Sequence, residues 1–212
     1  MRRLTNVRKY LPLVLAPLIS GCASVADLTA KLDAKASCCK SPAEFKYEPL
    51  QPGVAAPLSL GEESPAYAFA SGKSYFHAYS LPQQRAVTKL RVRSWATGST
   101  AFETRKLSQL YCPQVTFLDA TYQTVASNDK VPSWARGDLA TGLLPSFIAE
   151  FEVPSSAVYV VLHTNPAAYG RLATRYTGGG GYMVGSTFVM ERGGEPIHHP
   201  CGPTANAEIS LL

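Results

Sequence analysis

Short apolar segments separated by prolines and glycines constrain the fold of this chain more than any other feature of its sequence. In Lys89-Leu90-Arg91-Val92-Arg93, apolar side chains alternate with charged ones, which is the period-two pattern of a strand buried on one face. Residues 147–153 show the same alternation, and 158–162 are apolar throughout, as in a central strand. These patterns predict a β-sheet protein.

Nine segments are predicted as strands because each is short, apolar or alternating, and bounded by turn residues. They are 54–60, 74–81, 87–95, 114–118, 122–126, 147–153, 158–162, 182–190 and 207–211. The fourth and fifth are expected to form a hairpin around Asp119-Ala120-Thr121. Because only one weak helix is expected, near 167–175, the predicted fold class is all-β, an antiparallel β-sandwich or jelly-roll-like domain.

The first 22 residues have the three parts of a bacterial secretory signal. The positive start contains Arg2, Arg3, Arg8 and Lys9. The apolar stretch 11–19 is too short to supply the roughly 20 residues of a membrane span. Leu18-Ile19-Ser20-Gly21-Cys22 then matches a lipobox, in which the thiol takes a diacylglycerol before cleavage. We predict a signal peptide over 1–21 and lipidation at Cys22.

Lipidation would make the mature chain a membrane-anchored lipoprotein. Each buried methylene of a palmitate-type chain contributes about 0.8 kcal/mol, so two or three chains hold a protein without a transmembrane helix. Ala23 stands where Asp would favour retention at the inner membrane. The predicted location is therefore the outer membrane, facing the periplasm. The alternative is an ordinary signal peptide in which Cys22 merely lies near the cut.

Removal of the leader leaves a nearly neutral chain. Residues 1–21 hold four of the 20 basic residues and none of the 15 acidic ones, so 16 basic residues remain against 15 acidic ones and the formal charge falls from +5 to +1. This balance argues against a nucleic-acid partner, which calls for concentrated basic charge on the folded domain. The expected partners are the membrane, through the lipid, and an envelope protein or an oligosaccharide.

Four cysteines remain in the mature chain, Cys38, Cys39, Cys112 and Cys201. An even number in an oxidising compartment predicts two disulfides. A Cys38–Cys39 bridge would close across one peptide, with Cα atoms about 3.8 Å apart against a usual 4.4 to 6.8 Å. The crossed pairings to Cys112 and Cys201 are favoured on that ground, and the uncrossed pairing stays open.

The mature chain divides into a lipidated N-terminus and tether over 22–41, part of which has the composition of a short helix, and one sandwich domain over 42–212. No motif in the domain assembles a catalytic site. Gly72-Lys73-Ser74 lacks the first glycine of a phosphate-binding loop, and no Gly-x-Ser-x-Gly occurs. The glycine run 178–181 is interpreted as a loop. No cofactor is expected, and the chain is predicted not to be an enzyme.

The histidines and aromatic residues are weighed as ligand sites. His77, His163, His198 and His199 form the only conceivable metal set. The adjacent pair would point to opposite faces of an extended chain and is interpreted as a proline-flanked loop, so no metal is expected. Stacking on a sugar ring is open to Trp95, Trp134, Tyr111 and Tyr182. Core or cross-strand packing is the preferred interpretation for most aromatic residues.

Several stretches resemble the maltose operon periplasmic protein (MalM) family. They are Gly72-Lys73-Ser74-Tyr75-Phe76-His77-Ala78-Tyr79-Ser80-Leu81-Pro82 with Leu90-x-Val92-x-Ser94, then Pro113-Gln114-Val115-Thr116-Phe117-Leu118-Asp119, and Phe151-x-Val153-Pro154 with Val158-Tyr159-Val160-Val161-Leu162-His163-Thr164. The likeness covers about residues 40–212, and the lipobox and cysteine pair resemble a lipoprotein branch. It implies a non-enzymatic periplasmic protein linked to carbohydrate transport, especially of maltodextrin, and carries over no ligand residue.

Three functions therefore compete. The first is an outer-membrane lipoprotein whose sandwich is an accessory or interaction module, and it ranks highest. The second is a direct carbohydrate-binding module, which a planar strip of exposed aromatic rings would favour. The third is an envelope hydrolase, against which the missing nucleophile motif counts.

Overall fold

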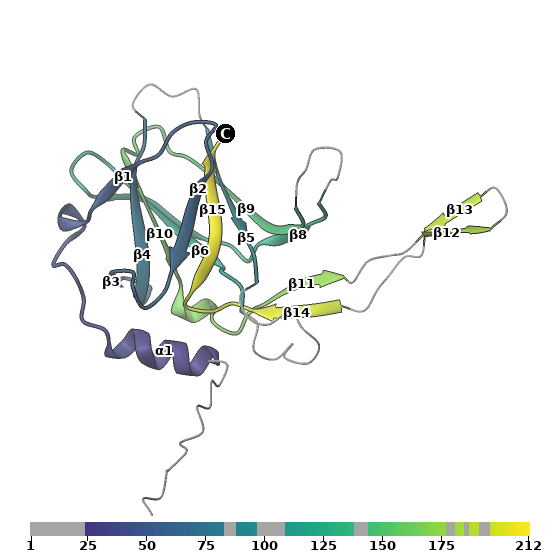
Figure 1. The fold of residues 1–212 in the computed structure, drawn as a ribbon. Helices are drawn as coiled ribbons and strands as arrows, with labels where there is room; N and C mark the ends of the chain where they lie inside the picture. Colours follow the sequence, from purple (N-terminus) through teal and green to yellow (C-terminus); the bar gives the residue numbers. More distant parts are fainter. Residues whose placement is uncertain are drawn as a thin grey trace, which may run out of the picture.

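Two β-sheets packed face to face form the body of the protein, as shown by the computed structural model (Figure 1). It describes residues 24–82, 88–96, 109–137, 144–176, 181–184, 187–190 and 196–212. The six-stranded sheet contains β1 (Tyr47–Pro49), β3 (Ala66–Phe69), β4 (Gly72–Ser80), β6 (Pro113–Leu118), β7 (Thr124–Asp129) and β10 (Tyr159–Thr164). Its order is β1-β4-β10-β6-β7, and β3 also pairs with β4.

The five-stranded sheet contains β2 (Ala56–Leu60), β5 (Lys89–Ser94), β8 (Ser133–Ala135), β9 (Ser146–Glu152) and β15 (Ala205–Leu211). Its order is β2-β15-β5-β9-β8, and all its pairs are antiparallel. In the first sheet only β1 and β4 run parallel. The predicted antiparallel β-sandwich is confirmed.

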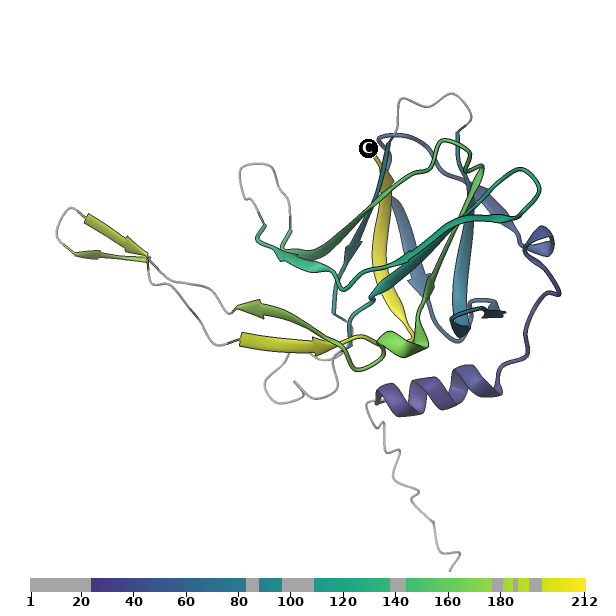
Figure 2. The ribbon, with the colours of Figure 1, turned by 180° about the vertical axis from the view of Figure 1, so that it is seen from behind.

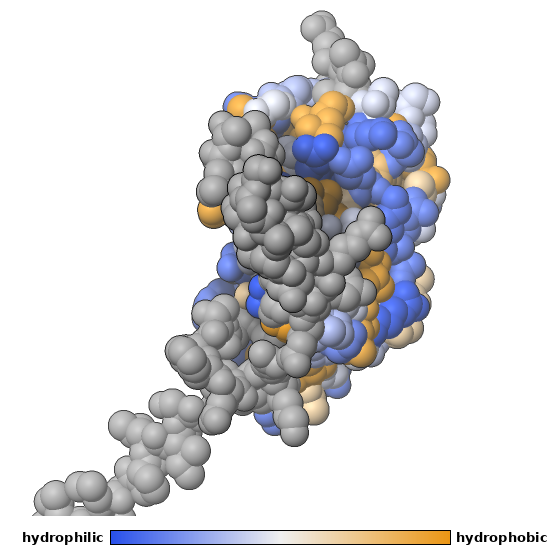
Figure 3. All heavy atoms as spheres, turned by 90° about the vertical axis from the view of Figure 1, so that its right-hand side faces the viewer, coloured by the Kyte–Doolittle hydropathy of each residue, from blue (hydrophilic) through white to orange (hydrophobic). Residues whose placement is uncertain are grey.

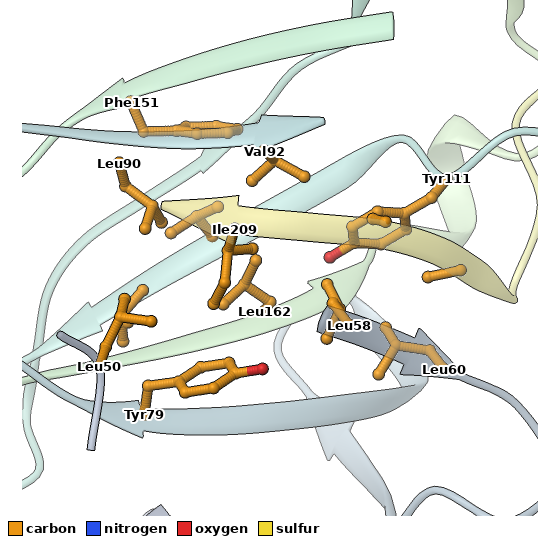
Figure 4. Close-up of a cluster of buried hydrophobic side chains, with 14 of the residues drawn as sticks. Leu50, Leu58, Leu60, Tyr79, Leu90, Val92, Tyr111, Phe151, Leu162 and Ile209 are labelled. Carbon is orange, nitrogen blue, oxygen red and sulfur yellow. The ribbon is translucent and has the colours of Figure 1, made fainter. Parts of the chain in front are cut away.

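The core lies between the inner faces of the sheets (Figure 4). Leu90 and Val92 of β5, Ile209 of β15 and Leu162 of β10 are fully buried there. The charged residues between them point outward, where Arg91 Nη2 lies 2.7 Å from the Glu150 carboxylate on β9. The alternation read in 89–93 is therefore the inward and outward alternation of a strand with one face in the core.

A short helix, α1 (Val25–Ala34), closes one end of the sandwich. A capping box starts it, since the Asp27 amide donates to Ser24 Oγ (3.2 Å) and the Ser24 amide donates to Asp27 Oδ2 (2.9 Å). Leu32 is buried in the core, and Lys73 Nζ at the start of β4 donates to the Asp33 carbonyl (2.8 Å). The helical interpretation of this stretch is confirmed, and the helix is packed against the domain.

A two-part ribbon projects from the sandwich (Figures 1 and 2). Its inner part pairs β11 (Leu172–Tyr176) with β14 (Pro196–Pro200), and its outer part pairs β12 (Gly181–Val184) with β13 (Thr187–Met190). The strand predicted over 182–190 is thus two strands. The glycine run 178–181 lies outside the described residues, except for Gly181 at the start of β12.

Two sequence predictions in this region are wrong. The helix expected near 167–175 is a 3-10 turn, η2 (Pro166–Ala168), followed by β11. Gly170, with φ +81°, redirects the chain between them, and pairing with β14 overrides local helix propensity. The loop expected at His198 and His199 is part of β14, which keeps the two side chains on opposite faces.

The crossed disulfide pairings that the sequence favours are wrong as well, because the structure bonds Cys38 to Cys39 and Cys112 to Cys201. The Leu110 amide donates to the Pro200 carbonyl (2.8 Å), and the Gly202 amide donates to the Leu110 carbonyl (3.1 Å). These bonds bring Cys112 and Cys201 together with a Cα–Cα distance of 5.4 Å. Backbone pairing between distant segments decides the partners, which local geometry alone could not show.

No helix in the described ranges is long and apolar enough to cross a membrane.

The two disulfides are expected to contribute very differently to stability. Cys112–Cys201 joins residues 89 positions apart, and restricting an unfolded chain by such a loop contributes roughly 4 to 5 kcal/mol. Cys38–Cys39 joins neighbouring residues and therefore hardly restricts the conformations of the unfolded chain. Urea unfolding of the Cys112→Ser/Cys201→Ser double variant should show most of this loss, with Cys38→Ser/Cys39→Ser as the matched control. Equal losses in the two variants would contradict this assignment.

Candidate functional site

The outer face of the six-stranded sheet carries a second, smaller apolar cluster. Phe76 and Ala78 of β4, Val161 of β10 and Leu118 of β6 form it together with Phe45, which precedes β1. Both faces of β10 are therefore buried, which explains why 158–162 are apolar throughout. The prediction that this segment is a central strand is confirmed, since β10 lies between β4 and β6.

Three half-buried tyrosines lie at one border of this outer cluster, and we call them the tyrosine cluster: Tyr47, Tyr122 and Tyr159. The Tyr159 ring lies 4.4 Å from the Tyr47 ring and 4.9 Å from the Tyr122 ring, with Tyr122 stacked on it at 9°. The Tyr47 and Tyr122 rings are 5.8 Å apart. The rings thus form a compact triangle, whose members partly cover one another, and not a planar strip.

A tight turn between β6 and β7 positions Tyr122. The Asp119 carboxylate accepts hydrogen bonds from the Thr121 amide (2.8 Å), the Thr121 hydroxyl (2.7 Å) and the Gln123 amide (3.0 Å). These bonds, the Thr121 hydroxyl first, lower the pKa of the Asp119 carboxyl. Tyr122 has φ +63°, a left-handed conformation that costs a residue other than glycine about 1 to 2 kcal/mol. Such backbone cost concentrates at functional positions.

The hydroxyls of Tyr47 and Tyr159 stay protonated over the physiological pH range. The hydrogen bond to the Tyr122 hydroxyl (3.5 Å) raises the pKa of Tyr159, and burial raises the pKa of Tyr47. Tyr47 Oη also donates to the Pro42 carbonyl (2.9 Å). The cluster therefore offers aromatic rings and hydroxyl groups, a combination that is enriched where proteins bind one another.

A cavity of about 270 Å³, which we call the edge pocket, lies beside the cluster. Its wall is built by residues from the segment before β1, from β1 and from β4, with Pro65 completing it. They are Cys38, Cys39, Glu44, Phe45, Lys46, Glu48, Pro65, Phe76, His77 and Ala78. Phe45 belongs to both sites, because its ring lies 6.2 Å from that of Tyr47.

The edge pocket exists because two short strands share one edge of β4 and leave a gap. The β3 register ends at Tyr75, and the parallel β1 register begins at Ala78. Polar groups line the gap: His77 Nε2 lies 3.2 Å from Glu48 Oε2, and the Lys40 amide donates to Glu44 Oε2 (3.0 Å). A mostly apolar hollow with a few polar groups is the usual form of a small-ligand site.

Another cavity, of about 310 Å³, lies on the outer face of the five-stranded sheet. Arg93 there lies 2.6 Å from the Glu208 carboxylate and also donates to the Leu144 carbonyl (3.1 Å). Figure 3, which faces β8 and the ribbon, shows mainly hydrophilic residues with separate apolar patches where the colour is visible. Ion pairs between arginine and glutamate side chains, such as this one, are typical of the solvent-facing side of a sheet.

The four histidines considered as a metal set are separated in the fold. His77 faces Glu48, and His163 Nε2 lies 3.0 Å from Thr116 Oγ1. His198 contacts Thr174, and His199 accepts from Arg175 Nε (3.1 Å). No group of three or more candidate metal ligands lies together within the ranges that the structure describes.

The residues singled out by their sequence have other roles. Lys73 and Ser74 of the rejected phosphate loop lie at the start of β4. Lys73 donates to the Asp33 carbonyl of α1 (2.8 Å), and Ser74 Oγ lies 2.8 Å from Thr164 Oγ1. Among the aromatic candidates, Tyr111 is in the core and donates to the His163 carbonyl (3.2 Å), and Trp134 packs edge-on against Phe147.

Trp95 lies beside the Arg93 guanidinium, 5.7 Å from ring centre to Cζ. The Tyr182 side chain lies outside the described residues, as do the signal peptide over 1–21 and Cys22. Sequence analysis missed the tyrosine cluster. Only the Asp119-x-Thr121 turn pointed to part of it, by placing Tyr122 at a hairpin end.

Comparison with protein-family models, with curated proteins and with solved structures found no match. The resemblance to the MalM family therefore stays a prediction.

The buried histidines are expected to make stability fall in acid. Burial lowers the pKa of His163 from 6.5 to about 4, and burial together with the Arg175 charge lowers that of His199 to about 4. Between pH 6.5 and pH 4 these histidines bind more protons in the unfolded chain than in the folded one. The free energy of unfolding is therefore highest above pH 6.5 and falls as the pH is lowered toward 4. For His163 alone the loss is at most about 3 kcal/mol.

Urea unfolding at a series of pH values measures this dependence. His163→Gln, which keeps a hydrogen-bonding group near Thr116, should flatten the curve between pH 6.5 and 4, and His198→Gln on the exposed face of β14 is the control. An unchanged slope in His163→Gln would show that the buried ring does not control the dependence.

Proposed function

We propose that this protein is a lipid-anchored, non-enzymatic interaction module of the bacterial envelope, tethered through Cys22 and presenting the tyrosine cluster to a partner. The observation that carries the proposal is the placement of two features at opposite ends of β4. The helix that follows Cys22 meets β4 at Lys73, and the tyrosine cluster surrounds the other end, where Tyr159 pairs with Ser80.

The short link between the lipid site and the folded domain supports this arrangement. Ser24, which caps α1, stands two residues after Cys22, a chain length of about 7 Å at most. Acylation at Cys22 would therefore hold the α1 end of the sandwich at the membrane surface. From Lys73 to Ser80, β4 extends roughly 23 Å. The tyrosine cluster would then face away from the lipid.

The chemistry of the cluster favours a protein partner. Tyrosine is enriched at interface hot spots because its ring buries apolar area while its hydroxyl bonds to polar groups. The rings of Tyr47, Tyr122 and Tyr159 partly cover one another, which leaves no flat strip for successive sugar rings. By resemblance to the MalM family, we propose a partner in carbohydrate transport, with maltodextrin as the sugar class.

Direct carbohydrate binding is the second candidate, because aromatic rings, hydroxyl groups and the edge pocket lie side by side around Phe45. Calorimetric titration with maltotriose separates the two. Saturable binding that the tyrosine variants below abolish would make carbohydrate binding the function. If millimolar maltotriose produces no heat of binding, the interaction module remains the proposed function.

Cys22 is expected to carry the acyl chains. Metabolic labelling with a fatty acid should mark the wild-type protein and leave Cys22→Ser unlabelled, unprocessed or soluble. The double variant Cys38→Ser/Cys39→Ser, whose cysteines lie within the folded domain, should be labelled like the wild type. A wild-type protein without label would end the lipoprotein proposal.

Partner binding is expected to require the tyrosine cluster. A photo-crosslinking residue at exposed Thr124, beside the cluster, should give a discrete adduct in cells, and Tyr122→Gly with Tyr159→Ala should abolish it. Tyr122→Gly by itself should change the free energy of unfolding by less than about 1 kcal/mol, since relief of the left-handed backbone offsets the lost ring contact.

Leu172→Ala, which removes an exposed apolar side chain on the ribbon, is the matched control. It should leave the adduct intact. The same adduct at wild-type intensity in the tyrosine variants would place the interface elsewhere.

A further inference from the structure

The Cys38–Cys39 disulfide differs from Cys112–Cys201 in exposure. Cys38 is exposed and Cys39 is partly exposed, whereas Cys112 and Cys201 are 4% and 1% exposed. A reductant must bring a thiolate up to one of the two sulfurs, so access limits the reaction. The edge pocket, which both Cys38 and Cys39 line, opens the vicinal pair to an attacking thiol.

The two disulfides also differ in their coupling to folding. Folding holds Cys112 and Cys201 together through the backbone bonds around Leu110, so the folded state favours their oxidised form. By linkage, a disulfide that stabilises the fold is itself stabilised by the fold. Cys38 and Cys39 are adjacent in the chain, so the fold does not protect their disulfide by bringing distant residues together.

The segment around the vicinal pair keeps contacts that do not depend on the sulfur bond. The Cys38 amide donates to the Ala66 carbonyl of β3 (2.9 Å), and the Lys40 amide donates to Glu44 Oε2 (3.0 Å). Phe45, which follows, packs against Phe76 with ring centres 4.2 Å apart. Cleavage of the disulfide would therefore leave this segment in place on the sheet.

We propose that Cys38–Cys39 is a redox-active couple of the folded protein whose reaction partner is a dithiol. A thiolate of the dithiol attacks one sulfur, the Cys38–Cys39 bond breaks, and the departing cysteine sulfur takes a proton. The second thiolate of the dithiol then breaks the mixed disulfide. The dithiol leaves as a disulfide, and two electrons and two protons remain on Cys38 and Cys39.

This reaction changes the wall of the edge pocket at the border of the outer cluster, and neither cysteine belongs to the core between the two sheets. Both cysteines line the pocket together with His77 and Glu48, so reduction replaces one fixed bridge by two independently rotating thiols. A ligand held in the edge pocket would meet a different wall in each redox state. The inference does not depend on lipid anchoring or on the tyrosine cluster.

The test is reduction of the purified, folded protein by dithiothreitol, with alkylation of free thiols and peptide mass spectrometry. Cys38 and Cys39 should become alkylated at dithiothreitol concentrations at least tenfold below those that expose Cys112 and Cys201. Far-UV circular dichroism should be unchanged at that point. Amide NMR shifts should be confined to residues 38–46, 65–66 and 76–78.

The control variant is Cys38→Ser/Cys39→Ser, which should keep the fold and lose only the alkylation seen at low dithiothreitol. Four free thiols before reduction would overturn the proposal. Reduction of both disulfides over the same concentration range, reduction of Cys112–Cys201 first, or loss of the β signal when the vicinal pair opens would overturn it as well.

Discussion

Burial of the two inner sheet faces against each other is the interaction on which the rest of the structure depends. Leu162 on β10 and Ile209 on β15 are fully buried, and each lies on a strand with a neighbour on both sides. The inner faces position everything outside them, because a strand that alternates inward and outward has its outer residues placed once its inner residues are packed. Tyr159 on β10 and the part of the edge pocket that β4 forms are therefore fixed in place by contacts on the opposite side of the same strands.

The outer layer of the six-stranded sheet adds a constraint that is unusual for a sandwich, since antiparallel sheets commonly leave one face to water. Here Phe45 and the β3 side chains Tyr67 and Phe69 pack on part of that face. These side chains cover only part of the face, and the half-buried rings of the tyrosine cluster lie at the border of the covered part. The border is where apolar side chains meet solvent on a rigid support, and binding surfaces are favoured in such places.

Much of the sandwich could be predicted from the sequence, because in strands such as β5, β9 and β10 the pattern of apolar and polar residues matches the pattern of buried and exposed side chains. The strands β1, β3 and β8 have only three or four residues, too few to show a period. The helix expected near 167–175 was replaced by β11 because a partner strand outweighs weak propensity. The tyrosine cluster joins Tyr47, Tyr122 and Tyr159 from three separate segments, so only the sheet register reveals it. The same holds for the partner of Cys112.

The strand order β2-β15-β5 has a consequence for how the chain acquires its structure. β15 is the last strand in chain order, yet it lies between β2 and β5 and pairs with both. During synthesis from the N-terminus, the edges of β2 and β5 that pair with β15 would stay unpaired until β15 has been made. Contacts between residues as distant as Leu58 and Ala207 give the fold a high contact order, which slows folding. A chain of this design depends on being kept from aggregating until its final strand is in place.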